Sequence, residues 1–217
     1  MSSIEKVAIV GDIHGDAHRL RRALASEALV GRKVVFLGDY IDRGSSSREV
    51  LDILIDCQSA QPGWVFLEGN HESMLRGVRD GKVSAGNYVA GGGRSTILSY
   101  VRSGRQSVEA LLAQIPASHW DFLDRLDPIW LGEGIVATHA GIPNGETVLS
   151  RTNTIYGGNE WLLDPDAQPQ VRVVFGHYVQ TSGRPYLTHQ VACIDTGCGA
   201  GGALSVLLLP EWQCLQF

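Results

Sequence analysis

Two carboxylates and a guanidinium, those of Asp39, Asp42 and Arg43, stand within one short stretch from Gly38 to Gly44. The stretch follows an apolar run, Val34 to Leu37, that is typical of a buried strand. Aspartate and arginine are rarely buried unless they are paired or bind a metal. A hairpin turn would use similar residue types, because Asp and Gly favour turns. The stretch is therefore either a turn or a chemical site at the end of a strand.

The same arrangement, an apolar run followed by polar residues, occurs four more times and favours the site over the turn. The other runs are Val7–Val10 before Asp12 and His14, Trp64–Leu67 before Asn70 and His71, Gly134–Ala137 before His139, and Val171–Phe175 before His177. Helix-like segments between such runs predict an α/β protein. In α/β sheets, sites gather outside the carboxyl ends of the strands. We therefore expect these side chains to meet at one edge.

Six of these side chains can bind a metal ion. They are Asp12, His14, Asp39, Asn70, His139 and His177. Carboxylate, imidazole and amide oxygen suit divalent ions such as manganese, iron or zinc. Six ligands exceed what one tetrahedral site uses, so the set predicts two adjacent ions. Asp39 is the best bridging residue, because its carboxylate has two oxygens to share.

Two divalent ions roughly 3.5 to 4 Å apart are the arrangement that hydrolyses phosphate esters, because they turn a shared water into hydroxide for in-line attack. The leaving group then needs a proton. His71 follows the ligand Asn70 directly and is the predicted proton donor, with Asp42 orienting its imidazole. Arg43 is the predicted phosphate clamp, because its guanidinium fork matches phosphate oxygens. Asn70 is a second predicted contact for the substrate.

The signatures G-D-x-H-G, G-D-x-x-D-R-G and G-N-H-E stand in order at Gly11 to Gly15, Gly38 to Gly44 and Gly69 to Glu72. With the single histidines that follow, the chain resembles metallophosphoesterases of the phosphoprotein phosphatase type, and most of all their small bacterial and phage, lambda-type members. The resemblance implies a calcineurin-like α/β fold with a central β-sandwich of mixed sheets and flanking helices. It also implies these roles: Asp12, His14 and Asp39 for one ion, Asp39, Asn70, His139 and His177 for the other, His71 with Asp42 as the acid pair, and Arg43 on phosphate.

The chain departs from that family at one point. The family usually places a second phosphate-binding arginine between the last two histidines, near an aromatic-Asn-Arg stretch. Here residues 155–160 read Ile-Tyr-Gly-Gly-Asn-Glu and contain no arginine. Arg151 and Arg184 are the two residues that could replace it.

Three substrate classes remain open at the level of sequence. The lambda-type signatures favour a manganese-dependent phosphatase, with iron or zinc as alternative metals, that acts on phosphoserine or phosphothreonine in proteins, with phosphotyrosine as a further option. The alternatives are a diadenosine tetraphosphate hydrolase and a 2′,3′-cyclic phosphodiesterase. A nucleotide substrate would need aromatic stacking surfaces, and the helical region offers only Tyr88, Tyr100, Trp120 and Phe122. These four aromatic residues do not decide between the three substrate classes.

Composition sets the remaining limits. The net charge of −5 and the lack of a basic run argue against general nucleic-acid or membrane-surface binding. No apolar run approaches a membrane span, and four cysteines without a C-x-x-C pair or a signal peptide predict reduced thiols in a cytoplasmic protein. The length of 217 residues suits a single domain over 1–217, with a mainly helical insert at about 74–130.

Several residues outside the signatures have simpler interpretations. His18, His119 and His189 are expected to be surface or satisfied core histidines. Asp16 is expected to begin a helix, and Asp195 to brace a loop near the site. The triplet Gly91 to Gly93 is expected to permit a backbone turn.

Overall fold

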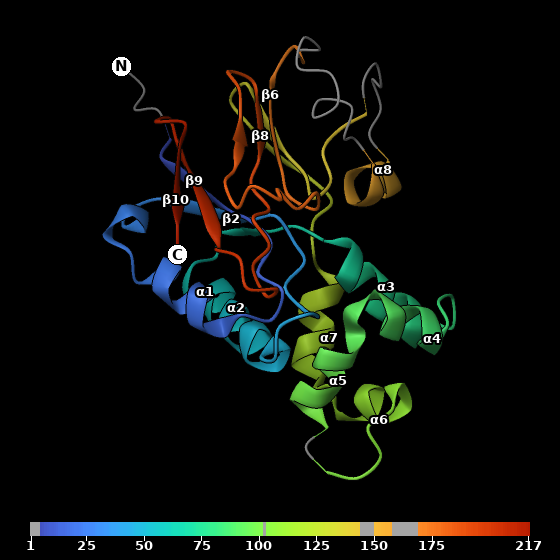
Figure 1. The fold of residues 1–217 in the computed structure, drawn as a ribbon. Coiled ribbons are helices and arrows are strands. Elements are labelled where there is room, and N and C mark those ends of the chain that lie inside the picture. Colours follow the sequence, from blue (N-terminus) through green and yellow to red (C-terminus); the bar gives the residue numbers. More distant parts are fainter. Residues whose placement is uncertain (1–4, 102, 144–149, 158–168) are drawn as a thin grey trace.

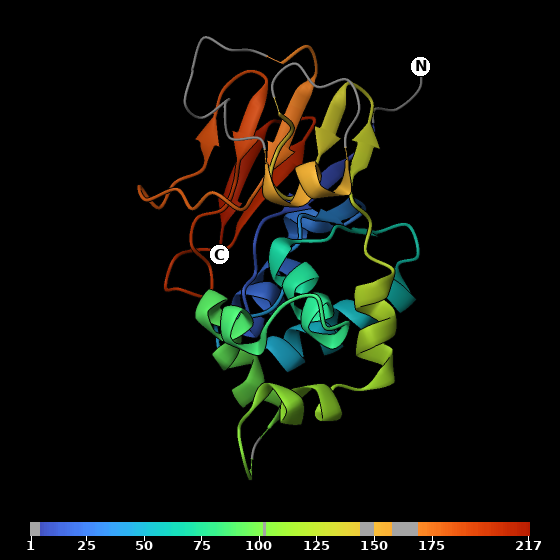
Figure 2. The ribbon, with the colours of Figure 1, turned by 90° about the vertical axis from the view of Figure 1, so that its right-hand side faces the viewer.

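Two five-stranded sheets face each other in a sandwich, and most of the helices gather on one side of it (Figures 1 and 2). The computed structural model describes residues 5–101, 103–143, 150–157 and 169–217. The strand orders are β10-β9-β1-β2-β3 and β4-β5-β6-β8-β7. The expected α/β class with a β-sandwich of mixed sheets is therefore confirmed.

In the first sheet β1, β2 and β3 pair in parallel, and β9 pairs antiparallel with both β1 and β10. Its strands are β1 (Val7–Val10), β2 (Lys33–Phe36), β3 (Val65–Phe66), β9 (Ser205–Leu209) and β10 (Gln213–Gln216). Val10 pairs with Phe36 across the parallel β1 and β2. The residues that follow these two strands therefore leave the sheet at the same edge.

The second sheet has the same mixed character. Its strands are β4 (Trp130–Gly132), β5 (Ile135–Ala137), β6 (Arg172–Phe175), β7 (Tyr186–Leu187) and β8 (Val191–Cys193). The parallel strands β5, β6 and β8 lie in the middle, and β4 and β7 pair antiparallel at the two edges. The sequence did not predict β4 and β7, which are three and two residues long, or β10, which has a glutamine at each end.

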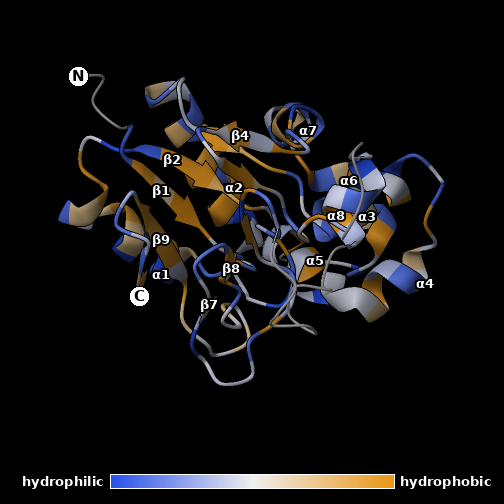
Figure 3. Cartoon of the chain, turned by 90° about the horizontal axis from the view of Figure 1, so that it is seen from above, coloured by the Kyte–Doolittle hydropathy of each residue, from blue (hydrophilic) through white to orange (hydrophobic). Residues whose placement is uncertain are grey.

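The central strands are apolar on both faces because both faces are covered. Along β1, Val7 and Ile9 point into the space between the sheets, whereas Ala8 and Val10 pack against helices on the other side. This alternation follows from the two-residue period of a strand. Figure 3 shows β1, β2 and β9 as hydrophobic, while helix α3 (Asn70–Arg79) carries both kinds of residue.

The helices form two groups (Figure 1). Helices α1 (Ala17–Leu24) and α2 (Ser47–Ala60) cover the outer face of the first sheet. The others that lie before β4 are α3, α4 (Ala85–Tyr88), the π-helical turn η2 (Val89–Gly93), α5 (Arg94–Tyr100), α6 (Val108–Gln114) and α7 (Ala117–Asp124). The short helix α8 (Arg151–Tyr156) lies beside the second sheet, and a 3₁₀ turn, η1 (Glu27–Leu29), follows α1.

The helical region from α3 to α7 is where the sequence anticipated an insert. Its aromatic side chains are packing residues: Tyr88, Tyr100 and Phe122 are buried, and the guanidinium of Arg79 lies 4.7 Å from the centre of the Trp120 ring. The three buried rings are therefore not available for stacking on a base, whereas Trp120 is half-buried. The division of 1–217 into one domain with an insert at 74–130 stays a prediction.

Among the described helices, none combines the length and the hydropathy that a bilayer crossing requires. All four cysteines, Cys57, Cys193, Cys198 and Cys214, are free thiols, as the sequence predicted.

Candidate active site

The six predicted ligands all follow strands that end at the same edge of the sandwich. Asp12 and His14 follow β1, Asp39 follows β2, Asn70 begins α3 after β3, His139 follows β5 and His177 follows β6. Four of them are buried, and Asn70 and His177 are half-buried. The edge therefore brings together side chains that are up to 165 residues apart in the chain.

The loops that carry these residues have an unusual backbone. His14, Asp39, Asp42, Arg43 and His177 have positive φ angles of 45°, 51°, 71°, 62° and 64°. Such a conformation costs a residue other than glycine about 1–3 kcal/mol, and it persists only where the surroundings enforce it. Here the backbone N–H of His14 donates to the carbonyl of Asp39 at 2.8 Å, so the loops after β1 and β2 hold each other.

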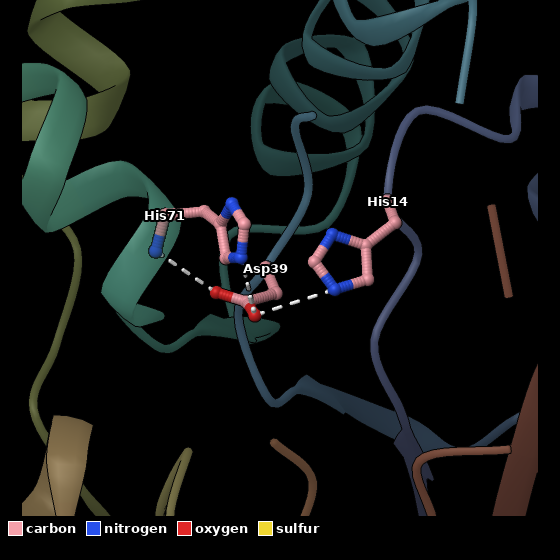
Figure 4. Close-up of side chains that lie close together, drawn as sticks. All are labelled: His14, Asp39 and His71. Atoms are coloured by element: carbon pink, nitrogen blue, oxygen red, sulfur yellow. Dashed lines mark hydrogen bonds and ion pairs between the residues drawn. The ribbon is translucent and has the colours of Figure 1, made fainter. Parts of the chain in front are cut away.

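The carboxylate of Asp39 lies between two groups of nitrogen ligands. Its Oδ2 is 3.4 Å from Nε2 of His14, and its Oδ1 is 3.4 Å from Nε2 of His139. Two clusters of potential metal ligands share it: His14, Asp39 and His71, and Asp39, His139 and His177. Figure 4 shows the first of these clusters. A carboxylate with one oxygen toward each cluster has the arrangement that a bridging ligand requires.

The histidines present their lone pairs to these clusters. Nδ1 of His14 is 3.0 Å from the carbonyl of Ile41, and Nδ1 of His139 is 3.0 Å from the carbonyl of Leu37. A carbonyl only accepts, so each Nδ1 carries the proton and each Nε2 is left with its lone pair. Nε2 of His14 is buried and has no hydrogen-bond partner. A histidine held by a backbone carbonyl with its other nitrogen unpaired is typical of metal binding, so these residues fit a divalent ion.

The second cluster has the same character. Oδ1 of Asn70 is 2.9 Å from Nδ1 of His177 and 3.1 Å from Nε2 of His139, and these two nitrogens are 3.2 Å apart. Burial lowers the pKa of His177 to about 4, and that of His14 also to about 4. At neutral pH these imidazoles are uncharged and can donate a lone pair to a cation.

Asp12 adds negative charge to the site. Both of its carboxylate oxygens accept from the backbone N–H of His177, at 3.3 and 3.1 Å. Burial raises the pKa of Asp12, and the neighbouring carboxylates of Asp195 and Asp39 raise it further. This excess of buried negative charge favours a cation. The cluster around His14 contains His71 and not Asp12, so the role of Asp12 as a ligand stays a prediction.

His71 and Asp42 form the close pair that the sequence anticipated. Nδ1 of His71 donates to Oδ2 of Asp42 at 2.7 Å, and both side chains are buried. Burial alone would lower the pKa of His71, but the carboxylates of Asp39 and Asp42 outweigh it and raise the pKa. Nε2 of His71 faces the site, 3.8 Å from Oδ2 of Asp39 (Figure 4). A protonated Nε2 in this place can donate to a leaving group.

Two of the arginines considered for phosphate binding differ in their surroundings. Arg43 is exposed in the loop after β2, directly after Asp42 of the acid pair. The guanidinium of Arg151 pairs with the buried carboxylate of Glu68 instead.

Arg184 and residues 158–160 are the other parts of the chain considered for the second phosphate contact. Arg184 is exposed in the loop before β7. Residues 158–160, within the stretch where the family carries an arginine, lie outside the described residues.

Sequence reasoning gave Glu72 no role, although it ends the third signature. Its buried carboxylate accepts backbone N–H groups of Asp39 (2.8 Å), Tyr40 (2.8 Å), Ile41 (3.2 Å) and Gly69 (3.1 Å). Glu72 thus ties the loop after β2 to the start of α3. Its position directly after the site residues Asn70 and His71, at the end of the third signature, was the available sequence signal.

Asp195 follows β8 at the same edge. Its Oδ1 accepts from the N–H of Gly197 at 3.0 Å, which agrees with a loop brace, and its Oδ2 is buried without a hydrogen-bond partner.

Known proteins resemble this chain, some over most of its length and others over about a third of it. The family described as calcineurin-like phosphoesterase matches residues 5–194. The asymmetrical bis(5′-nucleosyl)-tetraphosphatase PrpE of Halalkalibacterium halodurans is 28% identical over 237 aligned positions, which cover 94% of this chain and 89% of that protein. Serine/threonine-protein phosphatase 7 of Arabidopsis thaliana is 40% identical over 76 residues, which cover 34% of this chain and 18% of that protein.

Solved structures show the same fold. A crystal structure described as a candidate diadenosine tetraphosphatase superposes with a TM-score of 0.70 at 20% identity, and the match covers 100% of this chain and 94% of that one. The cold-active protein-tyrosine phosphatase of a Shewanella species superposes with a TM-score of 0.61 at 20% identity, covering 98% and 80%.

Proposed function

The chain belongs to the calcineurin-like phosphoesterase family, and we propose that it hydrolyses dinucleoside polyphosphates such as diadenosine tetraphosphate. One observation carries this proposal: PrpE proteins of several bacteria match 94–97% of the chain. Similarity of the signatures alone supports a shared phosphate chemistry, whereas similarity that extends over both sheets and the helical region also includes residues that can select the rest of the substrate.

A protein phosphatase is the second candidate, and the sequence had ranked it first. The observation that favours it is the higher identity, 40%, to a serine/threonine-protein phosphatase. That identity is confined to 34% of the chain. A shared signature region supports a shared phosphate chemistry and says little about the rest of the substrate, so we place the dinucleotide first.

Two divalent ions are part of the proposal, with manganese as the first choice and iron or zinc as alternatives. Asp12, His14 and Asp39 would hold one ion. Asp39, Asn70, His139 and His177 would hold the other. When bound, such ions neutralise the charge of phosphoryl oxygens and lower the pKa of water, which makes it a nucleophile near neutral pH.

The chain's own residues would then bind the phosphate and supply a proton. The exposed guanidinium of Arg43 would grip phosphoryl oxygens as a charge-assisted fork. As water attacks phosphorus, the bond from phosphorus to the leaving oxygen breaks, and that oxygen takes the proton from Nε2 of His71. The hydrogen bond from Nδ1 of His71 to Asp42, 2.7 Å long, would keep Nε2 directed at the leaving group.

The direct test measures turnover of three substrates side by side with manganese: diadenosine tetraphosphate, a phosphoserine peptide and p-nitrophenyl phosphate. We expect the dinucleotide to be hydrolysed with the highest kcat/KM and, if cleavage is asymmetrical, to give ATP and AMP by ion-exchange chromatography. Rapid turnover of the phosphopeptide with none of the dinucleotide would replace this proposal by the second candidate.

Removal of metal is the accompanying control. Dialysis against a chelator is expected to abolish hydrolysis of all three substrates, and re-addition of manganese, iron or zinc in separate samples shows which ion restores it. Full activity of protein that elemental analysis shows to be metal-free would contradict the metal-dependent mechanism.

A further inference from the structure

The triplet Gly91 to Gly93 does more than permit a turn, because it lies directly against the loop that carries Asp42 of the acid pair. Gly92 has a φ of +114°, and its carbonyl accepts the backbone N–H of Arg43 at 3.4 Å. A side chain at Gly93 would collide with the ring of Tyr88. The glycines therefore allow α4, η2 and α5 to close tightly over Asp42.

The carboxylate of Asp42 is surrounded by partners that come from this segment. Its Oδ1 accepts from the hydroxyl of Tyr88 at 2.8 Å and from the hydroxyl of Thr96 at 2.5 Å. Its backbone N–H is 3.0 Å from Oγ1 of Thr96 and 3.0 Å from Oγ of Ser47. Asp42, Tyr88, Thr96 and Ser47 are all fully buried. Oδ2 alone is left for His71.

Two donors on one oxygen fix the plane of a carboxylate. With Oδ1 held by Tyr88 and Thr96, rotation about the Cβ–Cγ bond would break two buried hydrogen bonds to a charged group, each of which contributes more than a neutral one. Oδ2 is thereby directed at Nδ1 of His71. This contact in turn determines which nitrogen of His71 faces the site.

We propose that Tyr88, supported by Thr96, is a positioning residue for proton donation: its hydroxyl holds Asp42, and through Asp42 it holds His71 toward the leaving group. This inference rests on the proposed acid role of His71. The Tyr88 hydroxyl donates to Asp42 and the side chain is fully buried, so it would act through Asp42. The helical region thus contributes to catalysis without reaching the reacting atoms.

The chain offers a matched control for the hydroxyl of Tyr88. Tyr100 is buried in the same region, and its hydroxyl is 2.6 Å from Nδ1 of His119, whose Nε2 is 2.9 Å from the carboxylate of Asp52. That network lies apart from Asp42 and is not part of the catalytic proposal. Tyr88→Phe and Tyr100→Phe each remove one buried hydroxyl and keep the ring.

The experiment compares both variants with the wild type on two aryl phosphates. The leaving group of p-nitrophenyl phosphate needs little protonation, whereas that of phenyl phosphate depends strongly on it. We expect Tyr88→Phe to lower kcat for phenyl phosphate about tenfold, the effect of one hydrogen bond to a charged group. For p-nitrophenyl phosphate we expect a change of less than about threefold, because general acid catalysis then contributes little. KM and bound metal should not change, and Tyr100→Phe should match the wild type in both reactions.

A double-mutant cycle separates positioning from a general loss of structure. In the His71→Asn background the acid is gone, so adding Tyr88→Phe should cause no further loss of kcat. The inference is overturned if Tyr88→Phe behaves like Tyr100→Phe, if it slows both aryl substrates equally, or if it still slows the reaction in the His71→Asn background. If the wild type does not hydrolyse diadenosine tetraphosphate and the variants still show the expected rates on the two aryl phosphates, only the dinucleotide proposal is refuted.

Discussion

The metal-ligand clusters and the acid pair meet at Asp39, yet they are held in different ways. On the ligand side, the imidazoles of His14 and His139 are fixed by the backbone carbonyls of Ile41 and Leu37, which both follow β2. On the acid side, Asp42 is fixed by side-chain hydroxyls of the helical region, those of Tyr88 and Thr96.

This difference separates two properties of the site. Backbone carbonyls at strand ends are set by the sheets, so the ligand geometry should tolerate most substitutions in the helices. The acid pair depends on particular hydroxyls that a single substitution removes. We therefore expect changes in the sheet loops to alter metal content, and changes around Asp42 to alter rates while metal stays bound.

Asp39→Asn should break both sides at once and have the largest effect. It keeps the shape of the side chain but removes the charge shared by the two clusters, so we expect activity to fall by about 10³-fold or more, as for loss of a central electrostatic group. Bound metal, measured by elemental analysis, should fall as well. Asp52→Asn, the same change on α2, is the control. A fully loaded and active Asp39→Asn protein would contradict the shared-ligand role.

His71→Asn should separate the two sides. Without the acid, we expect kcat for phenyl phosphate to fall by about 10²- to 10⁴-fold, and p-nitrophenyl phosphate to be affected far less. Metal content should remain at the wild-type level. Because His71 also lies in the ligand cluster with His14 and Asp39, loss of metal from this variant would instead make His71 a ligand and move the boundary between the two sides.

Arg43→Ala and Arg151→Ala test which arginine grips phosphate. Loss of the exposed guanidinium of Arg43 should raise KM by roughly 10- to 100-fold, because a charge-assisted contact contributes about 1.5–3 kcal/mol. Arg151→Ala should leave KM unchanged and lower the melting temperature, since Arg151 pairs with the buried Glu68. An equal rise of KM in both variants would assign Arg151 the role of the missing second arginine.

Substitution of two helix-capping residues should have the smallest effects on stability and activity. One cap lies near the metal-ligand loops and the other in the helical region. Asp16 accepts the N–H of Arg19 at the start of α1, and Ser107 accepts the N–H of Ala110 at the start of α6. Replacing either by alanine should lower the free energy of unfolding by about 1 kcal/mol, as measured by urea denaturation. Neither change should alter kcat by more than about twofold. Loss of metal from Asp16→Ala would show that the cap also secures the neighbouring His14.

Much of the fold could be predicted from local pattern. Besides the five apolar runs, the sequence pattern predicts strands at 191–194 and 203–209 and helices at 49–57, 107–115 and 118–126. The structure has β8, β9, α2, α6 and α7 within a few residues of these ranges. Three of the four edge strands, β4, β7 and β10, were not anticipated, because β4 and β7 are only three and two residues long and β10 has a glutamine at each end. The helical spacing of Leu20, Ala23, Leu24 and Ala28 predicts a first helix that reaches Ala28. In the structure α1 ends at Leu24, and Ala28 lies in a separate 3₁₀ turn.

The sequence by itself determined the family, the sandwich and the identity of the side chains at the strand ends, because these depend on signatures and on the two-residue period of strands. Only the tertiary structure decided how those side chains divide: that Asp39 turns one oxygen to each cluster, that Glu72 ties two loops together, and that Tyr88 and Thr96 hold Asp42. Such contacts join residues dozens of positions apart. Their partners are selected by the packing of helices against strand ends, and no local pattern encodes that packing.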